Sequence, residues 1–305
     1  MPRTTAIATR ELSKTYKDVK ALDNVTLDLE PDRIYGLLGR NGAGKTTLMS
    51  ILTGQNYADH GTAEIFGHAP FEHDPTLSRI CFIRESQKYP DDFKVHQAFE
   101  SAALFFENWD EDLAQELVEA FALPIKRRIK KLSRGQLSAV GVIIGMASRA
   151  DITFFDEPYL GLDAVARQIF YDRLVEDFAE YPRTIVLSSH LIDEVANLLE
   201  HVIVIDKGQI VIDSDAEELR GTAVTVTGDA AKVQEFIGAA QVLHRDALGA
   251  LASVTIKAKL DADQREQAKL MGLDLSSVSL QQLVVRSALS GTTAQRTEER
   301  TEARK

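Results

Sequence analysis

The stretch DRIYGLLGRNGAGKTTLMSIL, residues 32–52, decides how this chain folds. It runs from a short apolar strand at residues 34–38 through a glycine-rich turn into an apolar helix. Four positions match the pattern G-x-x-x-x-G-K-[ST], namely Gly39, Gly44, Lys45 and Thr46. In this strand-turn-helix context, the turn's backbone N–H groups can point at phosphate oxygens, the lysine adds a positive charge, and the threonine hydroxyl can bind Mg²⁺. The sequence therefore predicts an α/β fold with a phosphate-binding loop.

Length and composition limit the class of protein. The chain has 305 residues, of which 44% are hydrophobic, which is enough for one large domain and a smaller one. No apolar run approaches the roughly 20 residues that span a bilayer, and MPRTTAIATR at the start lacks the apolar centre of a signal peptide. The single cysteine, Cys81, cannot form an internal disulfide, and the net charge of -11 argues against a nucleic-acid-wrapping protein. We expect a cytosolic chain unless a partner holds it at a membrane.

A second segment, DITFFDEPYLGLD at residues 151–163, carries two adjacent carboxylates after an apolar strand at residues 152–155. Alone, this pattern is equally typical of a strand followed by an acidic turn. Together with a phosphate-binding loop, it places Asp156 and Glu157 at the end of a parallel strand, where such sheets bind ligands. We expect Asp156 to hold Mg²⁺ through water and Glu157 to polarise a water for attack on a γ-phosphate. No asparagine is followed by lysine, so the guanine-specific N-K-x-D motif is absent.

A third segment, RTIVLSSHLIDEVANL at residues 183–198, again reads as a strand, at residues 184–187, followed by polar residues and His190. A lone histidine is often a helix cap or a surface group. At the end of the strand that follows the Asp-Glu strand, however, it could reach the γ-phosphate as a hydrogen-bond donor.

The segment KKLSRGQLSAV, residues 130–140, opens an apolar helix. Ser133 and Gln136 have the spacing of a capping box, in which two side chains satisfy N–H groups of the first helical turn. On its own, this segment predicts only a helix start.

Taken in order, these segments resemble the nucleotide-binding domain of ATP-binding cassette (ABC) proteins, over residues 5 to about 215. GRNGAGKTT is similar to the family's Walker A loop, LSRGQ to its signature, ITFFDEP to its Walker B strand, GLD to its D-loop, and SSH to its switch histidine. The resemblance implies ATP and Mg²⁺ as ligands. The nucleotide-binding positions that it implies are Tyr16, Gly39, Arg40, Asn41, Gly42, Ala43, Gly44, Lys45, Thr46, Thr47, Ser133, Gly135, Gln136 and Asp163.

The family resemblance also implies that two cassettes meet head to tail. Ser133 and the N–H of Gly135 would then bind the γ-phosphate of ATP held by a second copy or by a homologous ATPase. The free N–H groups of a helix start suit an anion as well as they suit a capping oxygen. Tyr16 would stack on adenine, although tyrosine also favours strands for their own sake.

The catalytic residues implied by the resemblance are Glu157 and His190. The metal-binding positions are Thr46, Asp156, Glu85 and Gln87. Two departures from the family pattern leave alternatives open. Glu85 aligns where the family usually has a glutamine, and Gln87 follows two residues later, so either could contact the metal. Arg134 replaces a glycine of the signature and either approaches the partner's phosphates or points to solvent.

We expect an ABC domain at residues 1–220 with a helical subdomain at about 86–148. A small α/β domain at 221–289 and a disordered tail at 290–305 should follow. In transporters the helical region docks on the membrane subunit. Four aromatic residues either serve that contact or belong to the core, namely Phe99, Phe105, Phe106 and Trp109.

The resulting expectation is an ATPase that powers a separate integral membrane permease from the cytoplasmic face, with no nucleic-acid partner. Residues 279–289 resemble the ending of exporter ATPases, so we expect export. The rival is a soluble ABC ATPase acting on ribosomes or DNA. A single P-loop, a single signature and the absence of long heptad runs count against this rival. An inactive cassette fits poorly, because Lys45, Asp156, Glu157 and His190 are all present.

Overall fold

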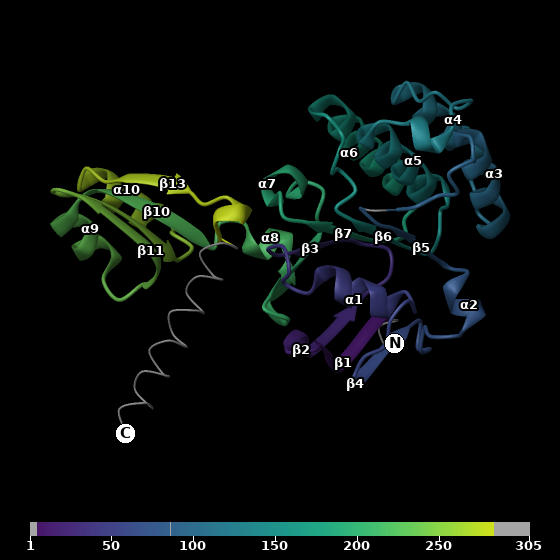
Figure 1. The fold of residues 1–305 in the computed structure, drawn as a ribbon. Coiled ribbons are helices and arrows are strands. Elements are labelled where there is room, and N and C mark those ends of the chain that lie inside the picture. The colour runs from purple at the N-terminus through teal and green to yellow at the C-terminus, as the bar shows by residue number, and fades with distance from the viewer. Residues whose placement is uncertain (1–4, 86, 284–305) are drawn as a thin grey trace. The chain divides into compact units, whose positions relative to one another are not determined.

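The computed structural model describes residues 5–85 and 87–283. Within it the chain divides into two compact units, and the colours of Figure 1 follow the chain through both of them. The first contains the residues up to His190 together with Asn197–Asp213, and the second contains Leu191–Ala196 and the residues from Ser214 onward. The predicted boundary at 220 lies a few residues beyond this division. The tail at 290–305 and most of the helix expected at 279–289 lie outside the described residues.

A six-stranded sheet forms the centre of the first unit. In spatial order its strands are β5 (Ile80–Ile83), β6 (Ile152–Asp156), β7 (Thr184–Ser189), β3 (Ile34–Leu38), β8 (His201–Asp206) and β9 (Gln209–Asp215). The pairs β5–β6, β6–β7, β7–β3 and β3–β8 are parallel. Every residue of β3, β6 and β7 is buried, as expected for parallel strands covered on both faces. The strands predicted at 34–38, 152–155 and 184–187 are thereby confirmed, and the apolar stretch at 80–83 forms a further strand of the sheet.

The strand register brings the sequence motifs to one edge of this sheet. Leu38 at the end of β3 pairs with Ser189 at the end of β7, and Asp156 at the end of β6 pairs with Ser188. The three chain segments that leave these strands therefore begin side by side. This edge is where parallel α/β sheets bind their ligands.

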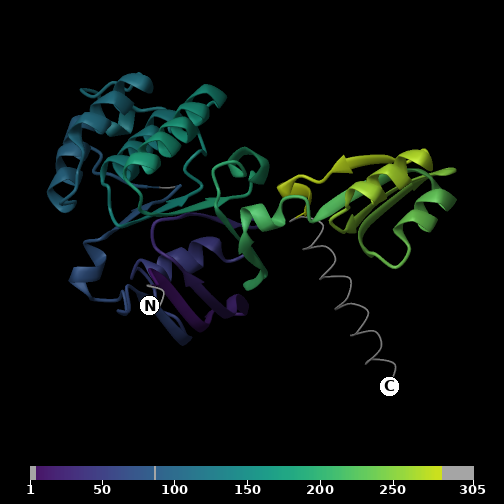
Figure 2. The ribbon, with the colours of Figure 1, turned by 180° about the vertical axis from the view of Figure 1, so that it is seen from behind.

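Helices cover both faces of the sheet. Helix α1 (Lys45–Leu52) lies on one face, and α5 (Arg134–Ala147) and α6 (Ala164–Glu180) lie on the other (Figures 1 and 2). Helix α1 also packs on a three-stranded antiparallel sheet, through the apolar stripe that includes Leu48 and Met49. The strands of that sheet are β2 (Val19–Leu29), β1 (Ile7–Tyr16) and β4 (His60–Ile65).

The segment between β5 and β6 is mainly helical. Its elements are α3 (Val95–Phe105), α4 (Glu111–Ala120), a 3₁₀ turn (Ile129–Lys131) and α5. A Cβ added at Gly145 of α5 would lie 2.4 Å from the ring of Phe155, so glycine lets this helix approach β6 closely. The aromatic residues of the segment differ in burial. Phe99 is buried, whereas Phe105 is 76% exposed.

The second unit is built on a four-stranded antiparallel sheet with its own apolar core. Its strands, in spatial order, are β11 (Gln241–Leu248), β12 (Leu251–Lys257), β10 (Ala223–Asp229) and β13 (Asp274–Ser277). Its longer helices are α9 (Ala230–Ile237) and α10 (Ala262–Leu270). Within residues 5–85 and 87–283 the remaining short helices are α2 (Asp74–Leu77), α7 (Ile192–Val195) and α8 (Ala216–Leu219). The alternating segments TAVTVTG at 222–228 and ASVTIKAKL at 252–260 fall largely in β10 and β12, and DADQREQAKLMG at 261–272 contains α10.

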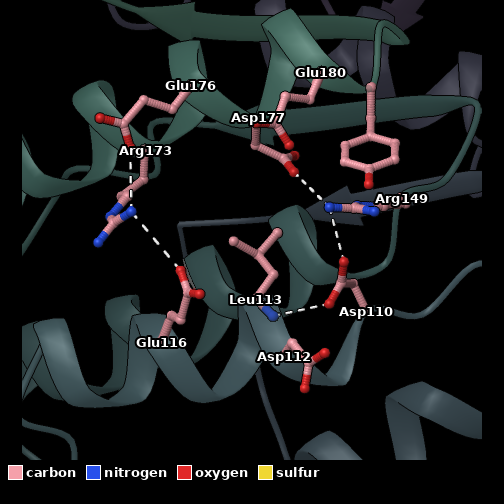
Figure 3. Close-up of a pocket in the computed structure, with 10 residues that line it drawn as sticks. Asp110, Asp112, Leu113, Glu116, Arg149, Arg173, Glu176, Asp177 and Glu180 are labelled. Carbon is pink, nitrogen blue, oxygen red and sulfur yellow. Dashed lines mark hydrogen bonds and ion pairs between the residues drawn. The ribbon is translucent and has the colours of Figure 1, made fainter.

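An ion-pair network fastens the helical segment to the rest of the first unit. Figure 3 shows the Arg149 guanidinium between Asp110, which caps α4, and Asp177 of α6, at 2.8 and 2.9 Å. The same guanidinium lies 3.5 Å from the centre of the Tyr181 ring. Asp177 is buried and also pairs with Arg183 at 2.7 Å. The acidic pocket around these groups is thus a structural joint between α4, α5 and α6.

Among the described residues, no helix is both long and apolar enough to cross a bilayer.

Substitution of Arg149 by methionine should lower the free energy of unfolding by about 2–4 kcal/mol, because it leaves the buried carboxylate of Asp177 with only one cationic partner. Urea unfolding followed by the fluorescence of Trp109, the single tryptophan, measures this loss. The matched control is Arg173→Met, which removes an exposed guanidinium from the same pocket and should cost less than about 1 kcal/mol. Equal losses in the two variants would contradict a structural role for Arg149.

Candidate functional site

The loop between β3 and α1 has the backbone shape that a phosphate-binding loop requires. Gly44 caps α1 with φ of 118°, and an added Cβ there would lie 2.6 Å from the carbonyl oxygen of Ala21. Gly42 has φ of 80° and open space around it. Both positions therefore favour glycine. Arg40 and Asn41 at the outer turn are exposed, whereas Ala43 is buried.

Lys45 points into the protein at the start of α1. Its side chain is only 6% exposed, and its ammonium donates a hydrogen bond of 2.7 Å to the carbonyl oxygen of Gly39. The same nitrogen lies 3.3 Å from Oε1 of Glu157. A buried ammonium needs such partners, since taking its charge out of water is costly. Lys45 and Glu157 thus balance each other's charge.

Thr46 and Asp156 meet beside this pair. The threonine hydroxyl donates to Oδ2 of Asp156 at 2.7 Å, and Ser188 donates to Oδ1 at the same distance. Thr46 is exposed whereas Asp156 is buried. Hydroxyl and carboxylate oxygens are the ligands that Mg²⁺ prefers, and Mg²⁺ commonly adds phosphate oxygens and water to one or two protein ligands. The two side chains fit such an ion, although no group of three or more His, Cys, Asp or Glu suited to a metal occurs within residues 5–85 and 87–283.

Glu157 is held in one place by several contacts. Its backbone has φ of 52°, and its N–H donates to Ser188 at 3.0 Å. Carboxylate Oε2 accepts a hydrogen bond from the Tyr159 hydroxyl and lies 2.8 Å from Nδ1 of His190. The other oxygen, Oε1, is buried and has no hydrogen-bond partner in the described structure beyond its ion pair with Lys45. Tyr159 and His190 therefore hold one oxygen, and the other has only the ammonium of Lys45 as a partner.

Tyr159 joins the groups at the ends of β6 and β7. It is 2% exposed, and its hydroxyl lies 3.1 Å from Oγ of Ser189 and 3.2 Å from Nδ1 of His190. The backbone N–H of His190 also donates to this hydroxyl at 3.2 Å. Burial, and next the hydrogen bond to Glu157, raise the pKa of Tyr159. The phenol therefore keeps its proton at neutral pH and donates a hydrogen bond to the carboxylate of Glu157.

The sequence analysis did not single out Tyr159, Ser188 or Ser189 as site residues. The available signals were a tyrosine two residues after Glu157 and a pair of serines that ends the next strand. Neither signal is specific, because buried strands often end in small or aromatic residues.

The signature residues form the start of α5. Ser133 accepts a hydrogen bond from the N–H of Gln136 at 3.2 Å, and Oε1 of Gln136 accepts from the N–H of Ser133 at 3.1 Å. The predicted capping box is thereby confirmed as geometry. A Cβ added at Gly135 would lie 2.5 Å from the carbonyl oxygen of Gly161, so this turn packs directly on the D-loop. Arg134 forms an ion pair of 2.8 Å with Glu85.

The other predicted site residues lie in different surroundings. Asp163 caps α6 by accepting from the N–H of Ala166 at 2.9 Å. Tyr16 is 44% exposed at the end of β1, and the ammonium of Lys14 lies 5.5 Å from the centre of its ring. Thr47 is half-buried in α1.

A small pocket connects several of these segments. Glu85 and Gln87 after β5, Ser138 and Gly141 of α5, and Glu157 all line it. The structure thus brings Lys45, Thr46, Asp156, Glu157 and His190 together through direct contacts. It also places the Glu85 segment near Glu157. The arrangement can bind phosphate groups and a divalent cation, and it holds a buried carboxylate oxygen, Oε1 of Glu157, whose only partner in the described structure is the ammonium of Lys45.

Comparison with known proteins agrees with this site. The family model described as ABC transporter matches residues 22–160. The chain is 27% identical over 214 residues to the ABC transporter ATP-binding protein YtrB of Bacillus subtilis, covering 70% of this chain and 73% of that protein. It is 30% identical over 220 residues to the bacitracin transport ATP-binding protein BcrA of Bacillus licheniformis, covering 71% of this chain and 72% of the relative.

Solved structures show the same fold. An ATP-binding subunit of an ABC transporter superposes with a TM-score of 0.64 at 21% identity, covering 70% of this chain and 92% of that one. A dimeric bacterial ABC transporter cassette gives a TM-score of 0.61 at 20% identity, covering 69% of this chain and 98% of that one.

The doxorubicin resistance ATP-binding protein DrrA of Mycobacterium tuberculosis is 31% identical over 228 residues, covering 72% of this chain and 68% of DrrA. The chain therefore belongs to the family of ABC transporter ATP-binding proteins and is an ATPase of the ABC type.

Proposed function

We propose that this ATPase powers a separate membrane permease that exports its substrate, and that two copies meet head to tail around ATP. The contacts among Lys45, Glu157 and His190 at the sheet edge carry the proposal, because they join a buried phosphate-binding cation to a positioned carboxylate. The names of relatives support a transport function, and one of them gives export as the direction. They include doxorubicin resistance, bacitracin transport and Nod factor export proteins.

The phosphates of ATP would bind where the backbone N–H groups of the loop and the ammonium of Lys45 converge. In the structure this ammonium is paired with Glu157. A bound triphosphate offers Lys45 a second anionic partner and so weakens its hold on the carboxylate. Thr46 and Asp156 would hold Mg²⁺, which neutralises charge on the phosphates when bound. Binding of nucleotide thus prepares Glu157 for its role.

Glu157 would orient the attacking water and accept its proton. Its Oε2 is held by Tyr159 and His190, so Oε1 is the oxygen that would face the water once ATP draws the Lys45 ammonium away. The Tyr159 hydroxyl sets the rotamer of this carboxylate and simultaneously holds His190. Positioning of this kind lowers the reaction barrier, because no reorganisation is needed at the moment of reaction.

The second half of each ATP site would come from the partner copy. Ser133 is exposed at the start of α5, where the helix dipole and the N–H of Gly135 favour an anion. The capping box satisfies two N–H groups of this turn in the free chain. The γ-phosphate of an ATP molecule held by the second copy would replace part of the capping box as the acceptor for these N–H groups. A chain alone would then lack a complete site.

The permease partner would place the ATPase at the cytoplasmic face of a membrane. Helix α3 ends in Leu104 and Phe105, which are 87% and 76% exposed. Two such side chains next to each other on one helix end are apolar surface suited to contact with another protein.

Affinity purification of the tagged full chain from solubilised membranes of its host should therefore recover one integral membrane protein in a stoichiometric amount. Leu104→Ser and Phe105→Ser together should lower this recovery several-fold without reducing expression. Mass spectrometry of the bound fraction, compared with the untagged host, makes the measurement. Recovery of ribosomal proteins or DNA instead would contradict the transporter function and favour the soluble rival.

Loss of the Tyr159 hydroxyl in Tyr159→Phe should lower kcat for ATP hydrolysis about tenfold or more, because a hydrogen bond to a charged group is lost. The KM for ATP should stay unchanged. Glu157→Gln should retain ATP binding and lose turnover by orders of magnitude. Steady-state kinetics on the full chain measures both variants.

If Tyr159 acts through Glu157, adding Tyr159→Phe to Glu157→Gln should cost no more than about twofold further. The matched control is Tyr35→Phe, which removes another buried hydroxyl, one that donates to the carbonyl of Glu30, and should leave kcat unchanged. Independent, multiplicative losses in the double variant would show that Tyr159 does not position Glu157.

A further inference from the structure

Two residues that depart from the family pattern are in contact with each other. Arg134 stands in the signature where a glycine is usual, and Glu85 stands where a glutamine is usual. Nη2 of Arg134 lies 2.8 Å from Oε1 of Glu85, although 49 positions separate them in the chain. We propose that this pair is a latch that couples the segment after β5 to the signature, which makes Arg134 a positioning residue of the shared ATP site. The inference rests on the proposed head-to-tail function.

The stem of Arg134 is fixed by the D-loop. A Cβ added at Gly161 would lie 2.9 Å from Cγ of Arg134, so the arginine stem crosses over the bare backbone of this glycine. Gly161 has φ of 97°, which also favours glycine. A larger residue at this position would push the arginine away. The packing of its stem on Gly161 therefore directs the guanidinium of Arg134 toward Glu85.

The first turn of α5 and the D-loop form one packed body. Ser138 donates to the carbonyl oxygen of Leu160 at 2.5 Å, and Gly135 touches the carbonyl of Gly161. Ser133 caps the same turn by accepting a hydrogen bond from the N–H of Gln136. A displacement of this body therefore moves the groups that are proposed to bind the partner's ATP.

Glu85 lies at the other end of the ion pair with Arg134. Together with Gln87 it lines the pocket that Glu157 and Ser138 share. The segment after β5 thus faces the chain's own catalytic carboxylate, whereas the start of α5 would face the ATP of the second copy in the proposed dimer. An ion pair between them links the chain's own nucleotide site to the site that it completes in its partner.

The pair has the character of a reversible contact. The side chain of Arg134 is 69% exposed and that of Glu85 is 46% exposed. Water and salt weaken exposed ion pairs, so this one adds little to stability. An exposed pair whose arginine stem packs on Gly161 can open and close during a reaction cycle. It suits coupling between segments better than permanent fastening.

The test is a double-mutant cycle on the full chain with Glu85→Gln, Arg134→Gln and the double variant. Each single substitution should lower the ATP hydrolysis rate about threefold to tenfold, and the double variant should be no worse than the poorer single one. Wild-type activity should approach that of the variants as ionic strength rises, because only the wild type has a pair to screen. Arg10→Gln, which breaks the equally exposed pair of Arg10 with Asp28, should change nothing.

Hydrogen exchange of the nucleotide-free chain provides a measurement that does not need turnover. Arg134→Gln should speed exchange in peptides that contain Glu85, and Glu85→Gln should speed exchange at residues 133–137. Multiplicative losses of activity, or exchange that changes only around the substituted residue, would overturn the latch. A wild-type chain without ATP hydrolysis would overturn the proposed function instead, and the cross-effects in exchange would still decide on the latch.

Discussion

The buried ammonium of Lys45 is the constraint on which the site depends. It has left water for a place between the carbonyl of Gly39 and the carboxylate of Glu157. A charge in such surroundings must be balanced, which fixes Glu157 close to the loop. Glu157 in turn carries Tyr159 and His190 with it. Glu157 is thus paired with an ammonium that a bound nucleotide can compete for.

The parallel sheet makes this pairing possible. Lys45 follows β3, Glu157 follows β6, and His190 follows β7, and the register places the ends of these strands together. More than a hundred residues separate Thr46 from Asp156 in the chain, yet their side chains share a hydrogen bond. A burial pattern that keeps β3, β6 and β7 in the sheet interior is therefore a condition for the chemistry.

Much of the fold and site could be predicted because its signals are local. The phosphate-binding loop, the strand that ends in Asp156, and the box of Ser133 and Gln136 each lie within a few consecutive residues. The role of Tyr159 and the contact of Arg134 with Glu85 could not be predicted, because each depends on side chains brought together from distant segments. In the second unit, α9 and β11 were missed. The helix is short, and β11 is mostly exposed, which leaves little apolar periodicity to detect.

The central claim is that one chain holds only part of an ATP site and that a second copy completes it. The most direct test measures turnover per chain with Mg²⁺ and saturating ATP over a wide dilution series. Sedimentation at each concentration gives the dimeric fraction. The claim predicts that turnover per chain rises with concentration, in step with the dimeric fraction. Undiminished turnover in a sample that sediments as a monomer with ATP bound would contradict it.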